Sequence, residues 1–498
     1  MIYLTNYVLG VLHMLTYSFE EKGKLTLYEY LYRCIKQDIL EGKLKKDERL
    51  PSKRNLAKHL DVSVITVESA YAQLQIEGYI YSWEKKGYFV SEVEEPIWNH
   101  EAKNRITQIK QETDLREKSD RKKIESQTAQ YKETVYFADF QTNNINSERF
   151  PFSIWSRLMR EVLSEKDTVL LQSMPYNGVE RLREAIAEYL YHFRGMEVYK
   201  EQVFIGAGTE YLYGLLIQLL GRDKVFAVED PGYKKIAYIY ASNGVKCEYI
   251  SMDAEGMSMM QLGNSNAQVV HISPSHHFPT GVVMPIRRRQ ELLKWAYEKE
   301  ERYIIEDDYD SEFRFLGKPI QTMQSIDRHE KVIYINTFSK SLAPSIRISY
   351  MILPMHLLEK FNREMSFYAC TVSSFEQYTL ANFMQRGYYE KHINRMKNFY
   401  KSQRNLVISA MKNSSLYYKM KIKEENAGLH FLLEVDTELS DEELLEKLRQ
   451  ENIRITSLSQ YYHNQENSRE HVLIINYSGI DAEKMPEVIK RLGKILEE

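Results

Sequence analysis

Apolar residues near the N-terminus recur at helical spacing in three short segments. The first segment covers residues 27–39, and Ser52 and Ser63 are suitable N-caps for the second and third, which a tight turn joins. Two β-rich pieces, at 79–83 and 88–90, then flank a polar turn and predict a hairpin. Three helices followed by a hairpin are the order of a winged helix-turn-helix, a fold that binds DNA.

The pattern changes beyond Tyr136, where short apolar runs alternate with longer helical segments such as residues 287–299. The runs lie at 225–228, 269–272, 303–305, 332–335 and 348–353. This alternation predicts an α/β domain with a mostly parallel sheet covered on both faces. A helical region begins near residue 358, and runs at 429–435 and 472–477 then predict strands of a smaller terminal lobe.

A polar segment separates the two patterned regions. It is rich in Lys, Glu, Gln, Asp and Ser and contains almost no large apolar residue, which predicts a solvated linker. The expected division of the chain is an extension outside the fold at 1–24, a DNA-binding domain at 25–92, a charged linker at 93–132 and an α/β domain at 133–498, with its small lobe at about 358–498.

Composition narrows the class of protein. A length of 498 residues with 43% hydrophobic content supports two or three domains with sizeable cores. The three cysteines lie far apart and form no C-x-x-C pair, which argues against disulfides or zinc and indicates the reducing cytoplasm. No apolar run reaches the roughly 18–20 residues of a membrane span. The apolar stretch at 2–15 lacks a preceding basic residue, so we expect no signal peptide and take Met14 as an alternative start.

Positive charge is concentrated in the predicted DNA-binding domain. Between Lys43 and Lys58 there are seven basic and two acidic residues, on a chain whose net charge is −3. A charge run that stands alone is usually a solvated helix face. Beside a helix-turn-helix and a hairpin tip that contains Lys-Lys-Gly, it predicts contacts with DNA phosphates.

One lysine follows a predicted buried strand within a cluster of hydroxyl residues. Lys340 is the centre of Thr337-Phe-Ser-Lys-Ser341, and Arg347 lies seven positions further on. Hydroxyl groups and an arginine can hold a phosphate, and a partly desolvated lysine can form a Schiff base with a carbonyl cofactor. The alternative is an ordinary solvated lysine on a surface turn.

Three other strand ends carry candidate binding groups. Glycines in Gly206-Ala-Gly208-Thr209-Glu210 would let a helix N-terminus approach a phosphate, although such a piece is more often a plain turn. Glu306-Asp-Asp-Tyr-Asp310 would place carboxylates where open α/β folds bind ligands; a solvated acidic loop is the alternative. We expect no metal there, because no further ligands occur at a recognisable spacing. Tyr233 could offer its face to a planar ring.

The N-terminal motifs resemble the DNA-binding domain of the GntR family. They are Leu50-Pro-Ser-Lys-Arg-Asn-Leu-Ala, Val62-Ser63, Thr66-Val67, Leu74-Gln-Ile-Glu-Gly-Tyr-Ile80 and Lys86-Gly87-Tyr-Phe-Val90. The resemblance implies DNA contacts by Ser52, Lys53, Arg54, Ser63, Thr66, Lys86 and Gly87. In one departure, Val64 stands where the family usually has an arginine, and Glu68 stands where a second basic residue is common. Base recognition by arginine is therefore weaker or relocated.

The remaining motifs resemble the fold-type-I pyridoxal-5′-phosphate (PLP) enzymes, the aspartate aminotransferase superfamily. They are Glu229-Asp-Pro-Gly-Tyr233, Ser273-Pro-Ser-His-His-Phe-Pro-Thr-Gly281, Glu306-Asp-Asp-Tyr-Asp-Ser-Glu-Phe313, Thr337-Phe-Ser-Lys-Ser341 and Ala427-Gly-Leu-His430. Behind a GntR-like domain, they resemble the MocR subfamily of GntR regulators, the group to which GabR-like proteins belong. The resemblance implies a mostly parallel seven-stranded sheet, a smaller C-terminal α+β lobe, bound PLP and a homodimer.

The resemblance also assigns roles to single residues. It implies that Lys340 forms the Schiff base and that Asp307 bonds the pyridine nitrogen. Tyr309 would bond the cofactor's phenolic oxygen, and Tyr233 would lie against the ring. The residues around the phosphate would be Gly208, Thr209, Ser339 and Arg347. Phe278 replaces an asparagine that is usual in aminotransferases. Lys235 replaces the arginine that binds a carboxylate in GabR-like proteins, so 4-aminobutyrate is not carried over as the ligand. Arg454 is another candidate partner for an effector carboxylate, or else a surface charge.

Three functions are compatible with these motifs. The first is a PLP-dependent transcriptional regulator that binds operator DNA and senses an amine, an amino acid or PLP itself through Lys340. The second is a working aminotransferase with a fused DNA-binding domain, and the third is a dimerisation module without cofactor. Phe278 and the N-terminal domain favour the first, with no physiological turnover beyond a residual half-reaction.

Overall fold

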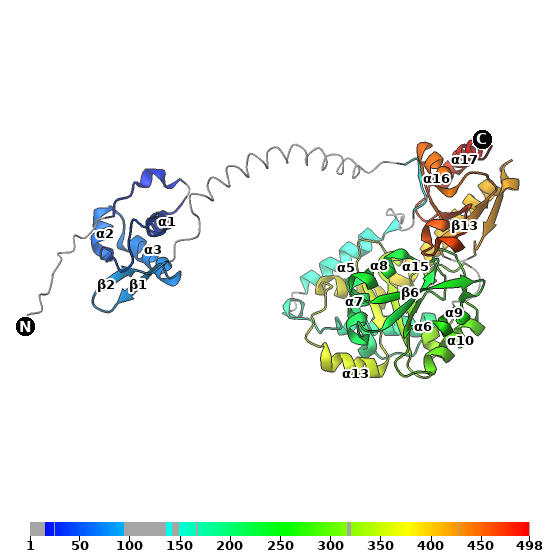
Figure 1. Cartoon of the computed structure of the whole chain (residues 1–498), viewed down its shortest axis with the longest axis horizontal. Coiled ribbons are helices and arrows are strands. Elements are labelled where there is room, and N and C mark those ends of the chain that lie inside the picture. The colour runs from blue at the N-terminus through cyan, green and yellow to red at the C-terminus, as the bar shows by residue number, and fades with distance from the viewer. Residues whose placement is uncertain are drawn as a thin grey trace, which may run out of the picture. The chain divides into compact units, whose positions relative to one another are not determined.

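The computed structural model (Figure 1) describes residues 15–23, 25–93, 136–141, 149–165, 168–315, 320–426 and 428–497. Contacts divide the chain into two units, Met1–Thr134 and Val135–Glu498, and each is described by itself. The predicted linker at 93–132 lies outside the described residues except for Val93, as does Ala427 of the predicted motif at 427–430. No helix in the described ranges is both long and apolar enough to cross a membrane.

The N-terminal unit is a winged helix-turn-helix. Its elements are α1 (Leu27–Leu40), α2 (Lys53–His59), α3 (Val64–Ile76), β1 (Ile80–Trp83) and β2 (Gly87–Val90). Both predicted caps form, since the Ser52 hydroxyl accepts the Asn55 N–H at 3.2 Å and the Ser63 hydroxyl accepts the Thr66 N–H at 3.0 Å. The two strands pair antiparallel, as the predicted hairpin requires.

Residues 15–23 pack on this domain, although the sequence predicted them in an extension outside the fold. Leu15 is 8% exposed and belongs to the domain's apolar core. The Tyr17 hydroxyl donates to Asp38 Oδ2 of α1 at 2.7 Å, and the ring of Phe19 lies 5.7 Å from that of Tyr30. The apolar side chains that suggested an unattached segment instead cover α1.

The C-terminal unit is built on one large sheet. Across it, the strands are β4 (Val203–Gly206), β11 (Ser349–Ile352), β10 (Val332–Thr337), β9 (Tyr303–Asp307), β8 (Val269–Ile272), β5 (Val225–Asp230), β6 (Lys246–Asp253) and β7 (Gly256–Met257). Neighbouring strands from β10 to β6 run parallel, whereas β11 and the two-residue β7 are antiparallel to their neighbours. The mostly parallel sheet predicted from the sequence is confirmed, and β7 adds an eighth strand at its edge.

Helices cover both faces of this sheet (Figure 1). One face packs against α7 (Thr209–Leu220), α8 (Lys234–Ser242) and α13 (Met355–Glu364). The other packs against α5 (Phe152–Ser164), α6 (Glu180–Arg194), α9 (Met259–Asn264), α10 (Ile286–Tyr297) and α14 (Ser374–Gln385). Because side chains alternate along a strand, Ile304 faces α10 while Ile305 faces α7, and both are fully buried. This explains why the strands are continuous apolar runs.

A smaller lobe completes the unit. Its sheet contains β12 (Met420–Lys423), β13 (His430–Val435), β16 (Val472–Asn476) and β15 (Thr456–Ser457), with α16 (Asp441–Gln450) and α17 (Met485–Glu497) beside it. The start predicted near residue 358 is too early, because α13 and α14 pack on the large sheet. Instead α15 (Tyr388–Lys412) runs from the large core into the lobe, and β3 (Ala138–Asp139) joins the lobe by pairing with β14 (Ile453–Arg454).

A buried ion pair holds the carboxyl end of β9 in place. Arg194 Nη2 lies 2.8 Å from Asp308 Oδ2, and the two side chains are 2% and 1% exposed. The Tyr334 hydroxyl donates to the same carboxylate oxygen at 2.7 Å, and Arg194 donates to the Ser275 hydroxyl at 3.1 Å. The end of α6, the end of β9, strand β10 and the segment after β8 therefore meet at one charged group.

Replacing Arg194 by methionine should destabilise the C-terminal unit strongly. The change leaves the Asp308 carboxylate buried without its counter-charge, which typically costs about 3–5 kcal/mol of unfolding free energy. Thermal and urea unfolding of the full chain would measure it. As a control, Arg287→Met removes a guanidinium that is 78% exposed, so it should change stability by about 0.5 kcal/mol or less. Equal losses in the two variants would contradict the account.

Candidate functional site

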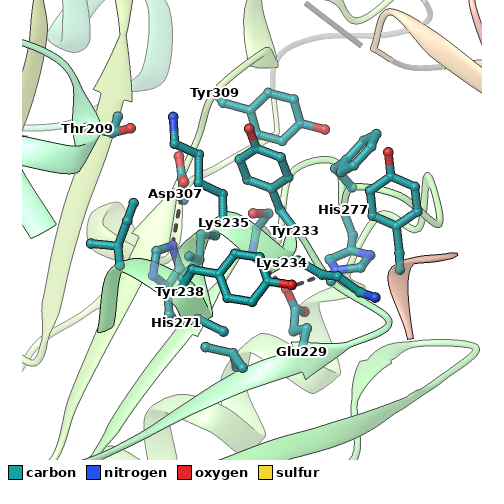
Figure 2. A pocket seen from close by; sticks show the side chains of 18 of the residues that line it. Thr209, Glu229, Tyr233, Lys234, Lys235, Tyr238, His271, His277, Asp307 and Tyr309 are labelled. Atoms are coloured by element: carbon teal, nitrogen blue, oxygen red, sulfur yellow. Dashed lines mark hydrogen bonds and ion pairs between the residues drawn. The ribbon is translucent and has the colours of Figure 1, made fainter. Parts of the chain in front are cut away.

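A cavity of ≈ 400 Å³ opens at the carboxyl edge of the large sheet. Its walls come from the ends of β5, β8, β9 and β10, from the first turns of α7 and α8, and from the small lobe (Figure 2). This is the edge at which open α/β folds bind ligands, because the strand ends leave a crevice there. Most of the residues that the sequence singled out for cofactor binding line this cavity: Thr209, Tyr233, Asp307, Tyr309, Ser339, Lys340 and Arg347.

Lys340 lies on the short helix α12 (Phe338–Ser341), directly after β10. The Thr337 hydroxyl caps this helix by accepting the Ser339 N–H at 3.2 Å, which fixes the turn that brings the lysine to the cavity. Burial lowers the pKa of the Lys340 amine to about 8, while the charge of Asp310 opposes that shift. At pH 7 roughly one tenth of the amine is therefore unprotonated and nucleophilic, far more than for an exposed lysine with a pKa near its usual value of about 10.4.

Asp307 is the last residue of β9, and its two carboxylate oxygens differ in their hydrogen bonding. The Tyr213 hydroxyl donates to Oδ2 at 2.6 Å, and His271 Nε2 lies 3.5 Å from the same oxygen, a contact drawn in Figure 2. His271 Nδ1 in turn lies 2.6 Å from the Tyr240 hydroxyl. Oδ1 is buried and has no hydrogen-bond partner among the described residues. A buried carboxylate oxygen of this kind can accept a proton donor from a ligand in the cavity.

Sequence reasoning missed Tyr213, His271 and Tyr240. Tyr213 lies on α7, where its hydroxyl is a polar group among apolar residues, and His271 is a polar residue within the apolar run of β8. A buried hydroxyl or imidazole on an otherwise apolar element needs a hydrogen-bond partner. These polar residues within apolar elements could therefore have indicated a buried polar site.

The N-terminus of α7 forms an anion-binding corner. Gly208 caps the helix with φ 94°, and a Cβ at this position would lie 2.2 Å from Arg347 Nη2. The glycine thus lets the guanidinium approach the helix N-terminus, where unpaired N–H groups favour negative charge. Glu210 supplies that charge in this structure, since its carboxylate pairs with both Arg347 and Lys235.

Aromatic rings form another part of the wall. Phe278 lies edge-on to three of them, with centroid distances of 5.9 Å to Tyr233, 5.1 Å to Tyr461 and 5.2 Å to His430. The Tyr309 hydroxyl lies 3.3 Å from His276 Nδ1. These rings give a ligand a largely apolar surface on which to pack.

The small lobe is fastened to the large sheet beside the cavity. Asp230, at the end of β5, accepts the backbone N–H groups of His463 at 2.7 Å and Asn464 at 3.1 Å. The ring of His463 also stacks on Tyr249 at 3.5 Å. Sequence patterns gave no indication of this contact, because the two segments are more than two hundred positions apart.

Glu229, the residue before Asp230, is a neutral acid in this wall. Burial raises the pKa of its carboxyl to about 8. One oxygen lies 3.3 Å from His277 Nε2, a contact drawn in Figure 2, and accepts the Ser273 N–H at 3.1 Å.

Arg454 is not among the residues that line the cavity, contrary to its proposed role as a carboxylate partner. It lies on β14 at the edge of the small lobe, 3.5 Å from Asp139 Oδ1 and bonded to Gln141. Lys235 does line the cavity but pairs with Glu210. Lys234 also lines the cavity, and within the described ranges it forms no ion pair.

The predicted DNA-contacting residues lie on the surface of the winged helix or cap its helices. Arg54 is exposed, and Lys86 Nζ lies 3.7 Å from the centroid of the Trp83 ring at the hairpin. Lys53 Nζ pairs with Glu68 Oε1 at 2.5 Å. Thus the acidic residue noted as a departure in the sequence neutralises one of the predicted phosphate contacts.

Comparisons with known proteins agree with this architecture. Residues 27–90 match the model of the gntR family of bacterial regulatory proteins, and residues 140–492 match that of aminotransferase class I and II. The chain is 37% identical to the uncharacterized HTH-type transcriptional regulator YdeL of Bacillus subtilis, covering 94% of this chain and 96% of YdeL. It is 31% identical to the probable rhizopine catabolism regulatory protein MocR of Rhizobium meliloti, covering 95% and 94%.

Among solved structures, the kynurenine aminotransferase of Pyrococcus horikoshii has a TM-score of 0.64 and 23% identity, covering 75% of this chain and 94% of that enzyme. This similarity concerns the fold alone. A winged helix followed by an aminotransferase-like unit defines a class of fused regulators. The chain belongs to the GntR family of bacterial regulatory proteins, in the MocR group of that class.

The Lys340 amine should titrate near pH 8. Burial disfavours the charged form, so the rate at which an acylating reagent labels Lys340 should rise as the pH increases through about 8 and then level off. Mass spectrometry after labelling over a pH series, on protein freed of bound small molecules, would measure this. Asp310→Asn should move the midpoint lower, because Asp310 stabilises the protonated amine. A midpoint above pH 10 in the unchanged protein would contradict the burial of the amine.

Proposed function

We propose that the protein is a DNA-binding transcriptional regulator whose aminotransferase-like unit holds PLP on Lys340 and senses an amine, an amino acid or PLP itself. The observation that carries this proposal is the buried, unpartnered Oδ1 of Asp307, a residue that lines the same cavity as Lys340. Such an oxygen suits a protonated ring nitrogen. The family of the N-terminal domain supports the regulatory part.

The residues of the cavity fit this cofactor. Asp307 would hold the pyridine nitrogen, and Tyr213 and His271 keep its carboxylate oriented from the other side. The N-terminus of α7 with Arg347 and Ser339 would hold the phosphate, for which Gly208 leaves room. When bound, PLP supplies an electron sink for reactions of amines. Tyr309 and Tyr233 would contact the ring.

Two features favour sensing over turnover. Phe278 lines the cavity with a side chain that has no hydrogen-bonding group, where aminotransferases usually place an asparagine that can hydrogen-bond the cofactor. Lys235, the candidate cation for a substrate carboxylate, is also partly neutralised, since it pairs with Glu210. An effector carboxylate would pair with Lys234 or displace Glu210.

The signal would pass from the cavity to DNA through a change in the preferred arrangement of the chain. A ligand shifts such an equilibrium only when it binds one arrangement more tightly than the other. The bonds from Asp230 to the segment at 463–464 make the small lobe responsive to what lies in the cavity. We further propose that the regulator acts in the cytoplasm as a homodimer on paired operator half-sites.

Addition of PLP to the purified protein should produce a visible absorbance band that saturates with concentration. Lys340→Ala should show no such band, because it lacks the amine that holds the cofactor. Lys235→Ala is the matched control, since it removes a lysine that lines the same cavity but should leave the band in place. An equal band in the Lys340→Ala protein would contradict the proposed attachment of PLP to Lys340.

The number of catalytic turnovers distinguishes the proposed regulator from a working aminotransferase. With an amino acid and an α-keto acid supplied in excess, we expect at most one amino group transferred per bound cofactor, and selection from random DNA should yield one preferred operator sequence. Sustained transfer without any sequence preference would show that the chain is an enzyme with a DNA-binding appendage.

A further inference from the structure

The helix α3 begins with two apolar side chains that leave the core of its domain. Val64 is 43% exposed and Ile65 is 73% exposed. Neither belongs to the apolar cluster of the winged helix, whereas Val67, Ala70 and Leu74 of the same helix are fully buried in it. Val64 and Ile65 therefore contribute little to the stability of the fold, and their apolar character needs another explanation.

The position of these side chains in the fold is that of the residues that meet DNA bases. The second helix of a helix-turn-helix enters the major groove with its N-terminal residues toward the base edges. Here the Ser63 hydroxyl caps that helix by accepting the Thr66 N–H at 3.0 Å. The cap fixes the first turn, so Val64 and Ile65 project from an ordered backbone.

The surroundings of the pair are suited to a polyanion. The ion pair between Lys53 Nζ and Glu68 Oε1, at 2.5 Å, fastens the basic start of α2 to the first part of α3. Arg54, the next residue of α2, is exposed. Glu68 neutralises Lys53, so the exposed Arg54 is, among the described residues, the unneutralised cation at the start of α2, the helix that packs against α3. Apolar side chains on a helix with such a neighbour fit a groove edged by phosphates better than an apolar protein partner.

We propose that Val64 and Ile65 recognise the 5-methyl groups of thymines in each operator half-site. Their side chains can neither donate nor accept a hydrogen bond, so they can distinguish bases only by apolar contact. In the major groove, thymine is the base that presents a methyl group. This inference rests on the proposed function, and it assigns base recognition to side chains other than arginine at the start of α3.

The test uses operator DNA selected by the full-length protein from a random pool. Each thymine of the bound sequence is replaced in turn by deoxyuridine, which lacks only the methyl group and keeps every hydrogen-bonding atom. At one or two positions in each half-site, we expect the dissociation constant to rise about 4-fold, the effect of losing burial of one methyl group. At the remaining thymines the affinity should not change.

Protein variants complete a double-mutant cycle that pairs each side chain with a thymine methyl group. Val64→Ala and Ile65→Ala should bind the thymine operator more weakly and should no longer distinguish it from the deoxyuridine operator at the position each side chain contacts. Ile76→Ala is the matched control: Ile76 ends the same helix and is 81% exposed, so its removal should leave the discrimination intact.

Each of the following outcomes would overturn the inference. Discrimination that persists in both the Val64→Ala and Ile65→Ala proteins, or deoxyuridine operators bound as tightly as thymine operators at every position, would show that the pair does not recognise methyl groups. If Ile65→Ala instead changes the oligomeric state in light scattering without changing the discrimination, the pair contacts a second copy of the chain. Failure to select any DNA sequence would count against the proposed function as well.

Discussion

The buried ion pair between Arg194 and Asp308 is the constraint on which the geometry of the cavity depends. Asp308 directly follows the last residue of β9 and points to Arg194, while its two neighbours Asp307 and Tyr309 line the cavity. The ion pair therefore fixes the segment from which both of these side chains reach the cavity. Two buried charges are costly to desolvate, and they persist only where further hydrogen bonds satisfy them. Tyr334 and Ser275 provide such bonds, which ties β10 and the segment after β8 to the same point.

Burial around that point also sets the chemistry of the site. It lowers the pKa of Lys340 to about 8, which favours a nucleophilic amine, and raises the pKa of Glu229 to about 8, which favours a neutral acid. One oxygen of Asp307 accepts a hydrogen bond from Tyr213, while the other has no partner among the described residues. The cavity thus combines one reactive amine, one oriented carboxylate and an anion-binding corner, the combination that a sensor of amines built on PLP requires.

Much of this could be predicted from the sequence because the strands are buried on both faces. Continuous apolar runs marked β5, β8, β9, β10 and β11. Because β5, β8, β9 and β10 are parallel, the polar motifs directly after these four strands meet at one edge of the sheet. Contacts between distant segments left no such signal. The fastening of Asp230 to residues 463–464, the packing of Leu15 on the winged helix and the assignment of α13 to the large sheet depend on tertiary packing that no local pattern encodes.

The proposed regulation requires that the state of Lys340 be coupled to DNA binding. The most direct measurement is the affinity for the selected operator with PLP present, with and without amines and amino acids, in the unchanged protein and in Lys340→Ala. The account predicts that at least one of these ligands, or PLP alone, changes operator affinity by about 5-fold or more in the unchanged protein and leaves the Lys340→Ala protein unaffected. The same change in both proteins would contradict it, because the signal would then not pass through Lys340.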